Sequence, residues 1–226
     1  AQPGTDGALA LAMTHVILRE FYVERETPYF ADYARRFTDL PFLVRLTERD
    51  GAHVAGAFLT AADLDRDGEH AEAKTVVWDT EANAPAVPNG SIGFRWGEEG
   101  AGRWNLDLEG VVPAITLMDA GETVSVDLPR FDVGETEGGG VMRRGVPVRR
   151  VGGHLVTTVF DLLAAHLGVA REGLPGEWPE GLDDPSPYTP AWQEEITGVD
   201  AGMVTRIARE FARNAERTNG RSMIVM

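Results

Sequence analysis

The chain has 226 residues, a formal net charge of −15 at pH 7 and no cysteine. The negative charge argues against a nucleic-acid partner, because protein and phosphate backbone would repel each other. The lack of cysteine excludes disulfides, thiolate-bound metals and iron–sulfur clusters held by these residues. The hydrophobic content of 43% is that of a globular protein, and no apolar run approaches the roughly 20 residues of a membrane-spanning helix.

The basic residues are unusually uniform. Lys74 is the single lysine among 21 basic residues, and all the others are arginine. An acidic, lysine-poor composition is typical of halophilic proteins, although a GC-rich genome also favours arginine over lysine. No signal peptide is visible and the first residues already belong to a motif, so we expect a segment of a longer polypeptide.

The opening stretch, Pro3 to Ala10, predicts a turn followed by a helix. Pro3-Gly4 is a turn signal, and apolar residues then recur at three- and four-residue intervals to about residue 23. The start of such a helix directs unpaired amides and the positive end of its dipole towards Gly4 and Thr5, where a phosphate can approach. The carboxylate of Asp6 suits the two donors of a guanine. The plainer alternative is that Thr5 or Asp6 only caps a surface helix.

The next elements resemble half of an α/β repeat. Residues 29–37 predict a short helix, and residues 40–46 predict a buried strand. A helix followed by an apolar strand is the unit from which parallel sheets are built.

Between about 48 and 150 the pattern changes to short strands. Asp50-Gly51 predicts a hairpin, and so does Gly152-Gly153 further along the chain. Residues 74–79 and 124–128 predict two more strands, while 134–140 has the glycine content of a loop. This region is expected to be an antiparallel insertion in an α/β protein.

Helical periodicity returns from about residue 157. A helix is predicted to end at Gly168, and an extended loop to run from 172 to 187. Thr189 and Asp200 are expected to cap the two helices that follow. The last of these should bury Met203, Val204, Ile207 and Phe211, expose its arginine row, and lead into a strand at 223–226.

Few residues outside the opening turn suggest chemistry. The five histidines do not have the spacing of metal ligands, and His15 is expected to be a packed, hydrogen-bonded residue. His166 lies five residues after Asp161, which is a poor same-face spacing on a helix. Residues 89–93 resemble a glycine-rich loop but lack the lysine of a P-loop, so a hairpin turn is expected there.

Several stretches of the sequence carry a family resemblance. Pro3-Gly4-Thr5-Asp6-Gly7-Ala8-Leu9-Ala10 resembles the motif that lines the molybdopterin guanine dinucleotide in the dimethyl-sulfoxide-reductase family of molybdopterin oxidoreductases. Residues 15–21 and 29–41 resemble one branch of it, the catalytic alpha subunits of respiratory nitrate reductases. Residues 87–98, including Arg95 and Trp96, agree with that branch, and so do residues 187–192 with 195–199.

The resemblance implies a site as well as an activity. Gly4, Thr5 and Asp6 would bind one guanine dinucleotide of a molybdenum bis(molybdopterin guanine dinucleotide) cofactor. Asp6 would recognise the guanine, because the aspartate ligand of molybdenum lies upstream of this motif in the family. No catalytic residue and no metal ligand is then expected within these residues.

The resemblance further implies an assembly. The substrate would be nitrate, reduced to nitrite by oxygen-atom transfer. Electrons would arrive through an iron–sulfur cluster elsewhere in the polypeptide, an iron–sulfur beta subunit and a haem b membrane gamma subunit. The enzyme would be membrane-associated through these partners, on the cytoplasmic face, or on the outer face in the haloarchaeal type.

The implied fold is α/β. It would comprise a Rossmann-like parallel-sheet portion in which 1–47 binds the cofactor, 48–150 is the inserted β-rich region, and 151–226 returns to the first sheet. Two alternatives remain open at this point. The first is another family member, such as a perchlorate, selenate or dimethyl sulfoxide reductase. The second is a non-catalytic α/β module that binds a nucleotide or a protein.

Overall fold

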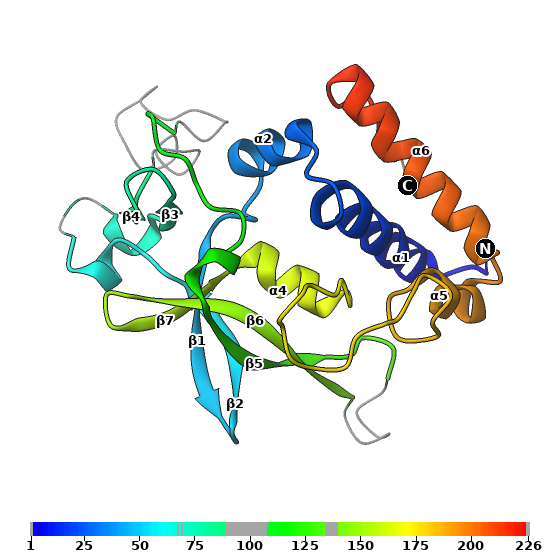
Figure 1. The fold of residues 1–226 in the computed structure, drawn as a ribbon, viewed down its shortest axis with the longest axis horizontal. Helices are drawn as coiled ribbons and strands as arrows, with labels where there is room; N and C mark the ends of the chain where they lie inside the picture. Colours follow the sequence, from blue (N-terminus) through cyan, green and yellow to red (C-terminus); the bar gives the residue numbers. More distant parts are fainter. Residues whose placement is uncertain (1, 67, 69, 89–107, 134–139, 225–226) are drawn as a thin grey trace. The chain divides into compact units, whose positions relative to one another are not determined.

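The computed structural model describes residues 2–66, 68, 70–88, 108–133 and 140–224. The chain divides into two compact units, each assembled from separated stretches. Unit 1 comprises residues 1–31, 128–144 and 163–226, and unit 2 comprises residues 32–127 and 145–162. Figure 1 shows the helices and strands in chain order.

Helices are the main elements of unit 1. The predicted first helix is α1 (Asp6–Leu18), which continues as the short π-helical segment η1 (Arg19–Val23). Near the other end of the chain lie α5 (Pro190–Thr197) and α6 (Ala201–Thr218). Helix α1 packs against both α5 and α6, and Figure 1 shows α1 and α6 side by side.

The buried face of α6 differs from the predicted one. Val204 and Ala208 are fully buried against Ala12 and Val16 of α1, whereas Met203 and Ile207 remain 47% and 41% exposed. The prediction placed Met203, Val204, Ile207 and Phe211 in the core. Val204 is buried as predicted, but the structure buries Ala208 in place of Met203 and Ile207, because valine and alanine let two helix backbones approach closely.

The end of the described chain also differs from its prediction. Residues 223 and 224, expected to begin a strand, lie outside any strand. Their side chains, Met223 and Ile224, are 82% and 57% exposed. Residues 225–226 lie outside the described residues.

Strands dominate unit 2. Strands β1 (Leu43–Arg49), β2 (Ala52–Phe58), β5 (Glu122–Pro129), β6 (Val141–Val151) and β7 (His154–Thr158) form a closed barrel in that order. Strands β3 (Val77–Asp79) and β4 (Ala84–Ala86) form a separate two-stranded sheet. Short helical segments complete the unit: α2 (Pro28–Phe37), which starts at the end of unit 1, α4 (Val159–His166), which ends in unit 1, η2 (Ala62–Leu64), η3 (Ala71–Ala73) and η4 (Met118–Ala120).

Both predicted hairpins are confirmed. Asp50-Gly51 connects β1 to β2, and Gly152-Gly153 connects β6 to β7, with both pairs antiparallel. All four turn residues have positive φ, which glycine and aspartate tolerate better than most residues.

Strand β1 was expected to belong to a parallel sheet, but it has no parallel neighbour among the described residues. Strand β1 is antiparallel to both of its neighbours, β2 and β7. The reason is local, because the Asp50-Gly51 turn reverses the chain before a crossover helix can form. The fold is mixed α/β, with one parallel pairing described, between His53 of β2 and Val126 of β5.

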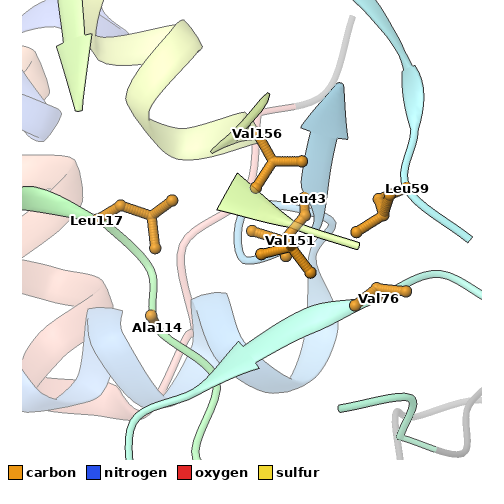
Figure 2. Close-up of a cluster of buried hydrophobic side chains, with 7 residues drawn as sticks. All are labelled: Leu43, Leu59, Val76, Ala114, Leu117, Val151 and Val156. Atoms are coloured by element: carbon orange, nitrogen blue, oxygen red, sulfur yellow. The ribbon is translucent and has the colours of Figure 1, made fainter. Parts of the chain in front are cut away.

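A compact apolar cluster lies within unit 2. Figure 2 shows its seven side chains gathered from β1, β6, β7 and three connecting segments: Leu43, Leu59, Val76, Ala114, Leu117, Val151 and Val156. The cluster joins strands that are far apart in sequence, so the barrel is held by non-local contacts.

A buried carboxylate in the first turn of α4 holds the segment that precedes η4 against this helix. Asp161 is fully buried and accepts hydrogen bonds from Thr116 Oγ1 at 2.6 Å, Leu117 N at 2.9 Å and Thr158 Oγ1 at 2.8 Å. The Thr158 hydroxyl in turn accepts from the Asp161 amide at 3.0 Å. In this reciprocal pair the Thr158 hydroxyl caps the first turn of α4 and the Asp161 carboxylate orients that hydroxyl, which gives Asp161 a structural role.

Among the described residues, no helix combines the length and the apolar character needed to cross a bilayer.

Candidate functional site

The predicted cofactor residues lie on one turn at the start of α1. Gly4 has φ of +80°, a conformation that glycine adopts without strain. Gly4 and Asp6 are exposed and Thr5 is half-buried. No atom would lie within 4 Å of a Cβ placed on Gly4, so the space beside the backbone is open.

The first turn of α1 has no side-chain cap. Thr5 occupies the cap position, but its hydroxyl donates to Gln2 O at 2.6 Å instead of accepting from the helix. Asp6 is already the first residue of the helix. The plainer interpretation, a side-chain cap by Thr5 or Asp6, is therefore wrong. The positive end of this helix remains open to a ligand.

The turn is attached to the end of α5. Gln2 N donates to Thr197 O at 2.9 Å. The Thr197 hydroxyl donates to Gln193 Oε1 at 2.7 Å, and Gln193 Nε2 donates to Val199 O at 2.7 Å. Gln193 and Thr197 are buried. This satisfied buried network fixes the chain on which the turn depends.

Helix α5 starts at the predicted cap. The Thr189 hydroxyl accepts from Trp192 N at 3.1 Å, and Pro190 takes the first helical position. The hydroxyl also donates towards the carbonyl oxygens of Asp184 at 2.5 Å and Ser186 at 3.0 Å. Asp200 likewise caps α6, accepting from Met203 N at 2.8 Å. Both predicted caps are confirmed.

We expect Thr189→Val to destabilise the chain by about 1–2 kcal/mol, because it removes the cap while keeping the shape of the side chain. The urea midpoint of the 226-residue chain measures this effect. Thr14→Val is the matched control, since the Thr14 hydroxyl only donates back to Ala10 O within α1. An equal loss in both variants would contradict a capping role.

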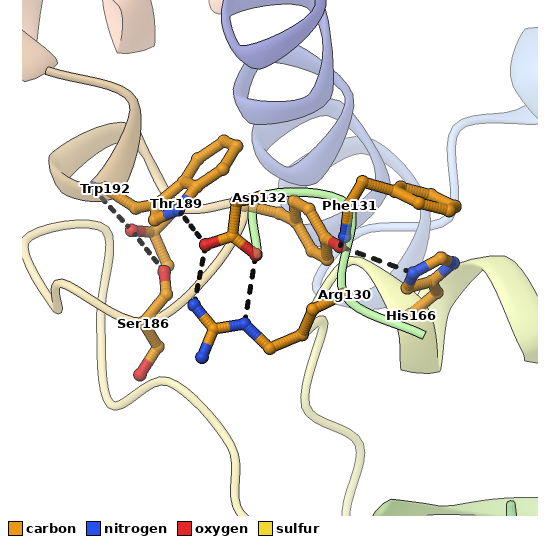
Figure 3. A network of polar contacts seen from close by, with 8 residues as sticks. Arg130, Phe131, Asp132, His166, Ser186, Thr189 and Trp192 are labelled. Carbon is orange, nitrogen blue, oxygen red and sulfur yellow. Dashed lines mark hydrogen bonds and ion pairs between the residues drawn. The ribbon is translucent and has the colours of Figure 1, made fainter. Parts of the chain in front are cut away.

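The segment that follows β5 contains an ion pair, Arg130–Asp132, and a hydrogen bond connects this pair to α5, as Figure 3 shows. Arg130 donates to both carboxylate oxygens of Asp132, at 3.0 Å and 2.6 Å, and Trp192 Nε1 donates to the same carboxylate at 3.0 Å. The hydrogen bonds from Arg130 are the main cause that lowers the pKa of Asp132. Asp132 is therefore a carboxylate with its oxygens already engaged, and we assign it a positioning role.

An aromatic cluster continues from this ion pair. The Tyr188 hydroxyl accepts from Phe131 N at 3.0 Å, and the ring of His166 lies 4.7 Å from that of Phe131. His166 Nε2 lies 2.7 Å from Pro129 O, and burial lowers the pKa of His166. A neutral His166 can donate to that carbonyl through Nε2, which holds the 129–132 segment in place. Phe131 itself is 67% exposed.

His15 is buried, as predicted. Its Nδ1 lies 2.7 Å from Leu167 O, and burial is the main cause that lowers its pKa, against the opposing effect of that hydrogen bond. The neutral ring donates to the carbonyl and leaves Nε2 without a partner among the described residues. His15 thus connects α1 to the residue that follows α4.

Protonation of His15 should weaken the fold. Its pKa is lowered in the folded chain and close to 6.5 in the unfolded one, so below about pH 6.5 the unfolded chain binds more protons and stability falls with pH. We expect His15→Gln to flatten the fall of the unfolding free energy between pH 7 and 5 by up to about 1.4 kcal/mol per pH unit. Urea unfolding at several pH values measures the slope.

Val16→Ala is the control for that experiment, because it removes buried apolar volume from the same helix without removing a titrating group. It should lower stability at every pH and leave the slope unchanged. A wild-type slope in His15→Gln would contradict the assignment.

Several residues discussed in the sequence analysis do not contribute to the candidate site. Asp161, whose spacing from His166 is a poor one for pairing, bonds to the 116–117 segment and Thr158. Residues 89–93, Arg95 and Trp96 lie outside the described residues, so the hairpin expected there stays a prediction. Within the described stretches, no group of three histidine or acidic side chains is placed to hold a metal ion.

Sequence reasoning missed the network around Asp132. Asp132 and Trp192 are 60 residues apart, and Phe131 and Tyr188 are 57 residues apart. Thr189 and Trp192 belong to a stretch singled out for its resemblance and its cap, but no periodicity or spacing linked that stretch to Arg130 and Asp132.

Comparison with known proteins identifies relatives over almost the whole chain. The chain is 55% identical over 230 residues to the nitrate reductase alpha subunit of Mycobacterium tuberculosis, and 45% identical over 244 residues to the respiratory nitrate reductase 1 alpha chain of Escherichia coli. It is 28% identical over 213 residues to the perchlorate reductase subunit alpha of Dechloromonas aromatica. No protein-family model matches the chain.

The first two matches cover 99% of this chain and 19% of each relative, so the chain spans about a fifth of their length. The identity falls from 55% and 45% for these nitrate reductases to 28% for the perchlorate reductase. Over nearly its whole length, the chain is therefore homologous to one segment of the nitrate reductase alpha subunits.

Proposed function

We propose that this chain is part of the catalytic alpha subunit of a molybdenum oxidoreductase that reduces nitrate to nitrite. The observation that carries the proposal is the match of 99% of the chain to nitrate reductase alpha subunits at up to 55% identity. We further propose that Gly4, Thr5 and Asp6 form one wall of the site for a molybdopterin guanine dinucleotide.

The chemistry of the opening turn fits that group. The first turn of α1 has no side-chain cap, so its amides and the helix dipole are available to a phosphate. Gly4 leaves open space beside the backbone. The exposed carboxylate of Asp6 can accept from the N1–H and N2–H₂ donors of guanine.

The roles of the chain and of the cofactor are separate. When bound, the molybdenum cofactor would supply the oxygen-atom and electron transfer. Gly4 and Thr5 would orient the cofactor by its phosphate, and Asp6 by its base. The hydrogen bond from Gln2 to Thr197 would keep the turn in place.

The remaining assignments concern the complete protein. An iron–sulfur cluster outside these residues, an iron–sulfur beta subunit and a haem b gamma subunit would deliver electrons, and would place the enzyme at the membrane. The Rossmann-like parallel sheet would then need strands from outside this chain, and the exposed Met223 and Ile224 are apolar residues suited to join it. Within the complete protein, residues 1–47 would bind the cofactor, residues 48–150 would form the inserted β-rich region, and residues 151–226 would return to the first sheet.

A perchlorate, chlorate or selenate reductase is the second candidate function, because the perchlorate and chlorate reductase alpha subunits match at 28% and 27% identity. Purification of the complete subunit, followed by metal and nucleotide analysis, tests the proposed function. We expect molybdenum and a guanine nucleotide, and turnover with a reduced dye that is fastest with nitrate. A subunit without molybdenum would refute the proposal, and a preference for perchlorate or selenate would favour the second candidate.

A further inference from the structure

A threonine precedes both α5 and α1, but only one of these two threonines caps its helix. Thr189, before α5, has φ of −78° and ψ of 165°, and its hydroxyl accepts from Trp192 N at 3.1 Å. Thr5, before α1, has φ of −110° and ψ of 13°, and its hydroxyl does not bond to the helix. A capping residue normally has an extended backbone, as Thr189 does. The backbone of Thr5 therefore keeps this residue out of the capping geometry.

The hydroxyl of Thr5 is engaged by the turn that precedes α1. It donates to Gln2 O at 2.6 Å, across the turn in which Gly4 has φ of +80°. The other polar main-chain group of Gln2, its amide, donates to Thr197 O at the end of α5, at 2.9 Å. Gln2 is thus held through both its amide and its carbonyl, and the carbonyl keeps the Thr5 hydroxyl away from the first amides of α1.

The residue that holds Gln2 is itself fixed by its side chain. The Thr197 hydroxyl donates to Gln193 Oε1 at 2.7 Å and accepts from Val199 N at 3.0 Å. Gln193 Nε2 then donates to Val199 O at 2.7 Å. Thr197 is 1% exposed and Gln193 is fully buried. Because this buried hydroxyl makes both of its bonds, the last turn of α5 and the Thr197 carbonyl have little freedom to move.

We propose that Thr197 is a positioning residue for the cofactor. It holds Gln2 so that the Thr5 hydroxyl stays off the first turn of α1, whose amides remain open to a phosphate. A threonine that capped its own helix would place its oxygen where an oxygen of the phosphate has to bind, so the two are mutually exclusive. The inference rests on the proposed function, in which the opening turn orients the cofactor by its phosphate. The side chain of Thr5 then keeps the site open, and main-chain amides contact the phosphate.

Thr197→Val in the complete subunit tests the proposal, because valine keeps the shape of the side chain but removes the hydroxyl that fixes the carbonyl. We expect the Gln2 amide of the cofactor-free subunit to exchange with deuterium about tenfold faster, as measured by mass spectrometry. Molybdenum and guanine nucleotide per subunit at limiting cofactor should fall about tenfold. Thr197→Ser keeps the hydroxyl and should restore both values. Thr205→Val removes a buried hydroxyl that donates to Ala201 O within α6, and should change neither.

These measurements separate positioning from a general loss of stability, which would speed exchange in α6 as much as at Gln2. Wild-type exchange or wild-type cofactor content in Thr197→Val, an equal increase of exchange in α6, or no recovery in Thr197→Ser would overturn the proposal. A molybdenum-loaded wild type beside an unaffected Thr197→Val refutes this inference alone. A wild-type subunit without molybdenum refutes the proposed function instead.

Discussion

Asp6→Ala is expected to lower the cofactor content of the complete subunit about a hundredfold at limiting cofactor, with little loss of folded protein. The proposed carboxylate–guanine contact consists of two hydrogen bonds to a charged acceptor, worth about 3 kcal/mol together. The side chain is exposed and the helix needs it only for a weak dipole interaction, worth below about 1 kcal/mol. Guanine nucleotide and molybdenum per subunit are the quantities to measure.

Two further variants sharpen this prediction. Asp6→Asn keeps one acceptor oxygen and should give an intermediate cofactor content. Asp32→Ala removes an exposed carboxylate from α2 and should leave the content unchanged. Full cofactor content in Asp6→Ala would contradict the role assigned to this residue.

Asp161→Ala is expected to give the largest loss of stability, about 3–5 kcal/mol. The substitution leaves three donors, Thr116 Oγ1, Leu117 N and Thr158 Oγ1, without their acceptor in a buried site. It also removes the acceptor that orients the Thr158 hydroxyl at the start of α4. Urea unfolding of the 226-residue chain, followed by far-ultraviolet circular dichroism, measures the loss.

Asp119→Ala is the matched control, because Asp119 is an exposed aspartate on the neighbouring segment η4. It should change the unfolding free energy by less than about 0.5 kcal/mol. If the two variants unfold at the same urea concentration, Asp161 does not hold the structure as described.

Local signals predicted much of this fold. Asp50-Gly51 and Gly152-Gly153 set their hairpins, and Thr189 and Asp200 cap their helices. In each case a short sequence determines the backbone through turn or cap chemistry, without help from distant residues. The helix predicted after the Pro3-Gly4 turn was also placed correctly, because α1 starts at Asp6.

Features that depend on tertiary partners were not predicted. The burial of Ala208 in place of Met203 and Ile207 depends on where α1 lies, and periodicity alone does not give that position. Similarly, a buried strand pattern at 40–46 does not say whether its neighbours will be parallel or antiparallel.

The candidate site also has parts that the local sequence predicted and parts that depend on distant residues. Glycine, threonine and aspartate in the opening turn were singled out from the sequence, and the structure places them together on an uncapped helix start. The Arg130–Asp132–Trp192 contacts join segments about 60 residues apart, and no local sequence pattern predicts them. The same holds for the pairing of Glu20 with Arg209.

A structure of the complete subunit with its cofactor bound would test the central claim most directly. The distance to measure is from the Asp6 carboxylate to the guanine. We expect the carboxylate within about 2.7–3.2 Å of the guanine N1 and N2 atoms, and a phosphate oxygen at similar distance from an amide of the Gly4–Asp6 turn. A bound guanine dinucleotide whose base and phosphates contact other residues, with this turn facing solvent or packed against protein, would contradict the account.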